Sequence, residues 1–293
     1  MLSEDASASG ATLLPAHLAD QLEDVARVLG ARRIRLFGGA AFDLVVGVRE
    51  HADLDIALPG RPEMRDTCLE RLRGHPEVTA VSDARQYWIR FHVPVTIVNA
   101  RWGETLLDLN FLDEWDSIGH FDIERVRWDF PSCTLEDPHG VTQRPVRTVR
   151  LVTGVGQDNP ILLLNRLLKL SAKYDIPFWQ DAKLFPVVNE LVVRAGTWAS
   201  KGTFQGRNAH AAFVQTLASA TRRSTDPVRF LRGCVESGVV ASRLPTLARR
   251  LADDPAALQE LAEAGSDDGF WSRADAVVGR TGTAWRRYRG GTR

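Results

Sequence analysis

The chain has 293 residues, enough for one large domain or two smaller ones, and its 44% of hydrophobic and 25% of charged residues are ordinary for a soluble globular protein. The formal net charge is zero. Cys68, Cys133 and Cys234 are widely separated and lack metal-ligand spacing, which argues against a disulfide framework or a zinc site and favours a cytoplasmic location. The most apolar helical stretch, residues 161–170, is too short and too charged to span a membrane.

The N-terminal part of the chain predicts a helix, a strand and a second helix. Residues 1–12 are small, polar and acidic, so we expect them to be disordered. Residues 15–29 carry apolar side chains at helical spacing, and Gly30 ends that helix. Residues 34–37 predict a short strand, and residues 41–46 predict a short helix after a pair of glycines.

Residues 52–58 alternate between acidic and apolar side chains. On a strand, this spacing places Asp53 and Asp55 on one face, and Leu54 and Ile56 on the other. The pattern therefore predicts a half-buried strand with two carboxylates side by side on its polar face.

A helix and two further strands are predicted next. Residues 63–72 have helical spacing, and residues 87–98 and 105–112 are typical of strands. A turn at residues 99–103 is expected to link the two strands. These elements predict a mixed α and β domain that extends to about residue 150.

The second half of the chain predicts helices only. The helical pattern begins at Asn159, and two glycines interrupt the chain before it, so we expect a domain boundary near residues 148–158. This gives a first domain at residues 13–150 and an all-helical domain at residues 151–293. The later helical segments are residues 183–196, 209–220, 227–238, 244–251 and 255–264.

The two predicted domains differ in charge. Residues 1–150 hold 17 Lys and Arg against 24 Asp and Glu, whereas residues 151–293 hold 20 against 13. A basic half attracts phosphate-rich ligands, but it can also simply dock on an acidic half. Both alternatives remain open at this point.

Gly38 and Gly39, followed by Asp53 and Asp55, form the pattern that carries chemistry. Glycines after a strand let backbone N–H groups approach a phosphate chain, and the N-terminus of the next helix adds a favourable dipole. Two carboxylates at i and i+2 of a strand repel each other unless hard cations such as Mg²⁺ neutralise them. The segment therefore predicts a magnesium-dependent phosphoryl-transfer site, and the alternative is a solvated polar strand.

A third carboxylate from a neighbouring strand completes such a site. In residues 105–112 the apolar side chains form one face, while Asp108 and Asn110 point the other way. Asp108 is therefore the predicted third metal ligand, with an ordinary exposed Asp as the alternative. Asp113 and Glu104 lie at the strand ends and are weaker candidates.

Residues 36–57 resemble the head domain of the tRNA nucleotidyltransferase and bacterial poly(A) polymerase family, within the DNA polymerase β-like superfamily. That family shows Gly-Gly, a helix end and Asp-x-Asp in the same order and at the same spacing. Residues 127–130, Arg-Trp-Asp-Phe, resemble its Arg-Arg-Asp-Phe motif, and residues 137–140 resemble the Asp-Pro-x-Gly turn that follows. The resemblance covers about residues 30–175, roughly half the chain.

The resemblance implies an α+β fold: a polymerase β-like nucleotidyltransferase head, with a mixed sheet and flanking helices, followed by an all-helical C-terminal domain. It implies that Asp53, Asp55 and Asp108 bind two Mg²⁺ ions and act in catalysis. Gly38 and Gly39 would then cradle a nucleoside triphosphate, the implied substrate.

The resemblance also implies contacts to the nucleoside. Arg127 and Asp129 would touch the ribose or the base, and a surface salt bridge is the alternative. The base-reading helix motif of the family, Glu-Asp-x-x-Arg, is not intact, and Asp158 and Arg166 are the nearest equivalents.

Two residues depart from the family pattern. Phe42 stands in place of the first motif's Arg, and Trp128 replaces the middle Arg of the second. Trp128 is expected to pack rather than to stack on a base. Asp43 is expected to cap or brace the glycine turn rather than to catalyse.

Three hypotheses about function follow. The first is a magnesium-dependent nucleotidyltransferase that moves a nucleoside monophosphate to an acceptor hydroxyl or phosphate and releases pyrophosphate. The short chain and the altered base-reading motif favour a small-molecule acceptor, which we expect. The family and the basic second half point to the alternative, an RNA 3′ end. The second hypothesis is a non-catalytic nucleotide- or RNA-binding relative, and the third is that the helical half delivers the head to a partner.

Overall fold

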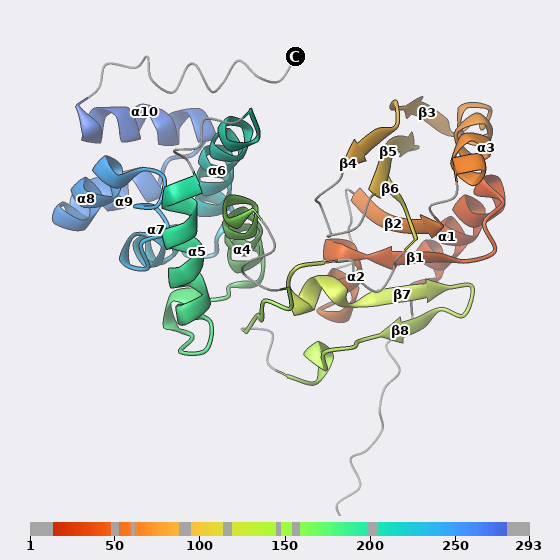
Figure 1. Ribbon diagram of the computed structural model, residues 1–293, viewed down its shortest axis with the longest axis horizontal. Helices are drawn as coiled ribbons and strands as arrows, with labels where there is room; N and C mark the ends of the chain where they lie inside the picture. Colours follow the sequence, from red (N-terminus) through yellow and green to blue (C-terminus); the bar gives the residue numbers. More distant parts are fainter. Residues whose placement is uncertain are drawn as a thin grey trace, which may run out of the picture. The chain divides into compact units, whose positions relative to one another are not determined.

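The computed structural model describes residues 14–47, 53–59, 62–87, 95–113, 119–144, 148–153, 159–198 and 204–279. The chain divides into two compact units, Met1–Arg144 and Pro145–Arg293 (Figure 1). The first unit is built on one mixed sheet with helices, and the second contains the helices α4 to α10. The predicted fold class, an α+β head followed by a helical domain, is confirmed.

Among the described residues, the sheet of the first unit has eight strands. They run in the order β3-β5-β6-β2-β1-β7-β8, with β4 paired to β5. The pair β2–β6 is parallel, and the other pairs are antiparallel. The strands are β1 (Ile34–Phe37), β2 (Asp53–Pro59), β3 (Val78–Val81), β4 (Arg85–Tyr87), β5 (Val95–Trp102), β6 (Thr105–Leu112), β7 (Arg127–Phe130) and β8 (Thr134–Glu136).

The hairpin between β5 and β6 differs from the sequence prediction. The predicted turn at residues 99–103 is wrong, because β5 continues through Asn99 to Trp102. Inward and outward side chains keep alternating along this stretch, so the strand does not end at the polar residue. The chain reverses instead at Gly103, whose φ of 56° suits a glycine, and Glu104.

Two helices cover one face of the sheet. α1 (Ala16–Leu29) and α3 (Pro62–Arg73) pack beside each other there (Figure 1). Buried residues recur at intervals of three and four along α1, which gives the helix one apolar stripe, and Gly30 ends it as predicted. This core contains Leu18, Leu22, Val25 and Leu29 of α1, Cys68, Leu69 and Leu72 of α3, and Leu36, Leu54, Ile56, Leu107 and Leu109 of the strands.

α2 (Gly38–Val45) begins directly after β1, earlier than the sequence predicted. Phe37 therefore occupies the N-cap position, and Asp43 lies inside the helix, where it does not cap it. α2 packs against β1, β2, β7 and the 3-10 helix Asp122–Arg125. Its N-terminus is thus fixed at the end of β1, beside β2.

The second unit consists of packed helices. Asn159 caps α4 by accepting the N–H of Ile161, which explains why the helical pattern begins there. The predicted helices are confirmed, and α10 is an additional one. No helix among the described residues is long and apolar enough to cross a membrane. The helices are α4 (Pro160–Tyr174), α5 (Phe185–Trp198), α6 (Phe204–Arg223), α7 (Pro227–Glu236), α8 (Pro245–Asp253), α9 (Pro255–Ala262) and α10 (Asp267–Val278).

Candidate active site

The three predicted carboxylates lie on one face of the sheet, opposite α1 and α3. In the parallel pair of β2 and β6, Asp55 is the register partner of Asp108. Asp53 precedes Asp55 by two residues and shares its face, whereas Leu54 between them is buried on the other side. Asp53 is exposed, and Asp55 and Asp108 are half-buried. Asp55 and Asp108 are thus neighbours across strands, and Asp53 lies two residues before Asp55 on β2.

Gly38 places the start of α2 against Asp55. Its φ of 72° lies in the left-handed region, and a Cβ built on it would stand 2.8 Å from Asp55 Oδ2. Gly39 is the second residue of the same helix. The first turn of a helix presents backbone N–H groups that have no intrahelical acceptor, and these favour anions. The glycine pair therefore puts the N-terminus of α2 beside a carboxylate.

The donor set suits Mg²⁺ in its chemistry. Mg²⁺ prefers carboxylate oxygens and keeps several waters, so one or two carboxylates are commonly enough. Asp55 and Asp108 offer such oxygens from adjacent strands, whose backbones are usually about 4.8 Å apart. Within the described residues, however, no group of three or more His, Cys, Asp or Glu side chains is arranged to hold a metal ion. The three aspartates share a face without closing around one point.

The Asp108 carboxylate is held by a neighbouring strand. Asn99 on β5 is its register partner, and the Asn99 Nδ2 donates a hydrogen bond to Asp108 Oδ1. Asn110, two residues further along β6, is fully buried, and its Nδ2 donates to the backbone oxygen of Asp108 at 2.7 Å. Both amides therefore hold Asp108: Asn99 binds its carboxylate, and Asn110 binds its backbone oxygen.

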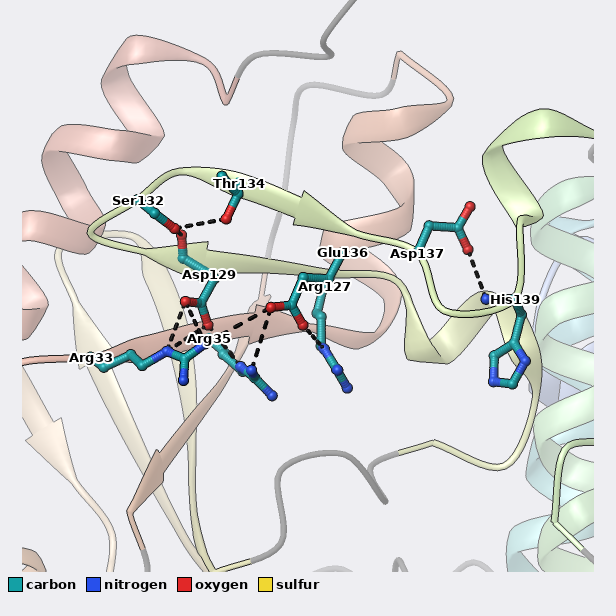
Figure 2. A network of polar contacts seen from close by, with 9 residues as sticks. All are labelled: Arg33, Arg35, Arg127, Asp129, Ser132, Thr134, Glu136, Asp137 and His139. Carbon is teal, nitrogen blue, oxygen red and sulfur yellow. Dashed lines mark hydrogen bonds and ion pairs between the residues drawn. The ribbon is translucent and has the colours of Figure 1, made fainter.

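Arg127 and Asp129 lie in an ion-pair network on β1, β7 and β8 (Figure 2). Asp129 faces Arg35 across the β1–β7 pair, and Arg35 Nε donates to Asp129 Oδ1 at 2.7 Å. Arg33 Nε donates to both oxygens of Asp129, at 3.0 and 2.7 Å. Arg127 Nε donates to Glu136 Oε2 at 2.6 Å. Three guanidinium groups thus surround two carboxylates.

Arg127 stands level with the aspartates on the same face of the sheet. Extending the β1–β7 register by one residue places Phe37 opposite Arg127. Phe37 in turn pairs with Asp55, and Asp55 pairs with Asp108. These residues form a row across β6, β2, β1 and β7, and three strand intervals span about 14 Å. Such a row has an anionic end and a cationic end.

The two departures from the family pattern are buried. Phe42 and Trp128 are each 1% exposed. The Trp128 Nε1 donates to the backbone oxygen of Ala41 at 3.3 Å, and its ring lies in the core on the α1 side. The expectation that Trp128 packs is confirmed, and its position lies on the face opposite the aspartates.

The turn after β8 is organised by Asp137. Burial alone would raise the pKa of Asp137, but hydrogen bonds from Thr142 and neighbouring backbone groups outweigh it and hold this pKa below its ordinary value. The Thr142 N–H and Oγ1 both donate to Asp137 Oδ2 at 2.8 Å. The His139 N–H donates to Asp137 Oδ1 at 3.3 Å (Figure 2). Asp137 therefore has a structural role in the turn.

The last two predicted nucleotide contacts belong to the second unit. Arg166 lies in the second turn of α4 and is partly exposed. Asp158 lies outside the described residues.

Sequence reasoning missed Arg33, Arg35, Glu136 and Asn99. Arg35 interrupts an apolar strand, and a buried position for a cation is a signal that a partner is needed. Its partner Asp129 is 94 positions away, so the pairing is not visible in the chain order. The contact of Asn99 with Asp108 was missed because the sequence pattern predicted a turn at Asn99.

The architecture is shared with solved structures of CCA-adding enzymes. A CCA-adding enzyme with CTP matches with a TM-score of 0.60 at 14% identity, over 94% of this chain and 65% of the other. The fold is that of the CCA-adding enzymes. A CCA-adding enzyme with ATP matches with a TM-score of 0.58 at 13% identity, over 96% and 68% of the two chains. The Thermotoga maritima CCA-adding enzyme complexed with tRNA-CCA matches with a TM-score of 0.54 at 12% identity, over 94% and 70%.

The resemblance noted in the sequence is thus confirmed at the level of fold, at low sequence identity. The chain spans about two thirds of the length of these CCA-adding enzymes. No protein-family model and no curated protein matches the chain.

Proposed function

We propose that the chain is a nucleotidyltransferase that uses a nucleoside triphosphate. The acceptor oxygen forms a bond to the α-phosphorus, the bond from the α-phosphorus to the bridging oxygen breaks, pyrophosphate leaves, and the acceptor loses its proton. The register pair Asp55–Asp108, beside the helix that begins at Gly38, is the observation that carries this proposal. It puts metal-binding oxygens next to an anion-binding helix end.

The residues of the candidate site have the following proposed tasks. Asp53, Asp55 and Asp108 would hold two Mg²⁺ ions, which supply Lewis-acid activation of the acceptor oxygen and charge neutralisation on the triphosphate. The backbone at Gly38 and Gly39 would bind the triphosphate.

The remaining contacts concern the nucleoside. Arg127, at the cationic end of the row, would lie on the sugar side with Asp129. Asp158 and Arg166 would read the base, as the family resemblance implies.

For the acceptor we propose an RNA 3′ end in place of the small molecule that the sequence favoured. The similarity to CCA-adding enzymes extends over more than nine tenths of this chain and so includes the helical unit. One of these neighbours is complexed with tRNA. The excess of Lys and Arg after residue 150 is what a phosphate backbone would require. A small-molecule acceptor has no comparable support.

One observation favours a second candidate, a non-catalytic nucleotide-binding relative. The carboxylates do not close around one point within the described residues. The departures at Phe42 and Trp128 do not add to it, because both side chains are buried.

The test is pyrophosphate release from each of the four nucleoside triphosphates with Mg²⁺, with and without bulk tRNA. We expect tRNA-stimulated release in the wild type and a loss of at least about 1,000-fold in Asp55→Asn, since metal contacts stabilise the transition state by several kcal/mol. Asp113→Asn is the matched control, because Asp113 is an exposed carboxylate just beyond β6, and it should keep the activity.

Other outcomes separate the alternatives. Release that needs a small-molecule extract instead of tRNA would replace the acceptor. Nucleotide binding that is equal with and without Mg²⁺, with no release under any condition, would favour the non-catalytic relative.

A further inference from the structure

Two carboxylates on the same face of the sheet are held by different chemistry. Asp129 is bound by the guanidinium groups of Arg33 and Arg35, which neutralise its charge. Among the described residues, the Asp108 carboxylate accepts a hydrogen bond only from the side-chain amide of Asn99. An amide donates a hydrogen bond without bringing a charge. Asp108 is therefore oriented by a neutral group, which leaves room for a cation as its charged partner.

The backbone of Asn99 is held independently of its side chain. The Asn99 N–H donates to Ser82 Oγ at 2.9 Å, and the Ser82 N–H donates to the Asn99 carbonyl at 2.8 Å. The ladder to β6 also continues on both sides of the Asn99–Asp108 pair. The strand thus keeps its place without the amide, and the amide makes no other hydrogen bond among the described residues than the one to Asp108.

We propose that Asn99 is a positioning residue for metal binding, which fixes the Asp108 side chain so that its second oxygen, Oδ2, serves the metal. This inference rests on the proposed function. A carboxylate that already has its bound conformation loses less rotamer freedom when a cation arrives. Hydrogen-bond partners of metal-binding carboxylates typically contribute about 10- to 100-fold to metal affinity.

The experiment measures Mn²⁺ binding to the full chain by electron paramagnetic resonance, with no nucleotide present. The variants are Asn99→Ala, Asp55→Asn and Ser82→Ala. Asn99→Ala removes the donor and keeps the backbone contacts, whereas Ser82→Ala removes a backbone contact and keeps the donor. Urea unfolding of each variant shows whether the fold is retained.

We expect Asn99→Ala to weaken Mn²⁺ binding about 10- to 100-fold with unchanged stability, and Ser82→Ala to change it less than about twofold. Asp55→Asn should abolish the specific binding. If Asp55→Asn abolishes binding but Asn99→Ala leaves it unchanged or tightens it, this inference is wrong and the proposed function stands. If Asp55→Asn has no effect, the proposed metal site itself is wrong, and the role proposed for Asn99 is then wrong as well.

Discussion

At the scale of single residues, Gly38 limits what else the site can accommodate. It is a glycine for two separate reasons: its φ is 72°, and a Cβ at this position would lie only 2.8 Å from Asp55 Oδ2. Gly47 shares only the first reason: its φ is 84°, and among the described residues, apart from its chain neighbours, no atom lies within 4 Å of its Cβ position. The two glycines therefore separate backbone strain from contact with the carboxylate.

We predict that Gly38→Ala lowers pyrophosphate release by on the order of 100-fold, because a displacement of a reacting group by about 1 Å has that effect. The cause is that the new methyl group pushes the Asp55 carboxylate away from α2. Gly47→Ala should lose about 1–2 kcal/mol of stability from the left-handed backbone and keep its rate. Steady-state rates and urea unfolding of both variants measure this, and equal losses of rate would refute the role of the contact.

At the scale of elements, the β7–β8 hairpin is bound to the chain at β1 by two arginine side chains that differ greatly in burial. The Arg35 side chain is 8% exposed and that of Arg33 is 51% exposed, although both bind Asp129. A buried cation that loses its partner is costly, whereas an exposed one is solvated by water. Of the two ion pairs that Asp129 makes, the buried one with Arg35 is therefore expected to contribute more to holding the hairpin on β1.

We predict that Asp129→Ala destabilises the first unit by about 3–5 kcal/mol, because it leaves Arg35 buried without its main counter-ion. Arg33→Ala removes the other guanidinium from the same carboxylate and should cost at most about 1 kcal/mol. Urea unfolding of the two variants compares them directly. Similar losses would mean that Arg35 finds other partners and that burial does not decide the strength of this network.

The elements also show which features of the site could be predicted from the sequence. The alternation in β2 and β6 predicted which face Asp53, Asp55 and Asp108 occupy, because side-chain direction on a strand depends only on neighbouring residues. Which strands pair is a different matter. The contacts of Asp108 with Asn99, and of Asp129 with Arg35, depend on register between strands that local pattern does not specify. The face that each of the three aspartates occupies was therefore predictable, and the partners of Asp108 and Asp129 were not.

At the scale of the whole molecule, each unit has a buried cysteine of its own. Cys68 on α3 and Cys234 on α7 are both 0% exposed. Burial raises the pKa of Cys68 to about 11 despite the opposing charge of Arg71, and burial also raises the pKa of Cys234. Only the thiolate is reactive, so both groups resist alkylation in the folded state. Each thiol thus reports the unfolding of the unit that buries it.

We predict that the two units unfold as separate domains, because each has its own core. Asp129→Ala should lower the urea concentration at which Cys68 becomes alkylated and leave that of Cys234 unchanged. Asp254→Ala should do the reverse, because Asp254 caps α9 by accepting the N–H groups of Ala256 and Ala257, and loss of such a cap costs about 1 kcal/mol. Pulsed alkylation read by peptide mass spectrometry gives both midpoints from one sample. If both midpoints shift together in either variant, the chain unfolds as one cooperative body, and the effect of a substitution near the aspartates extends to the helices.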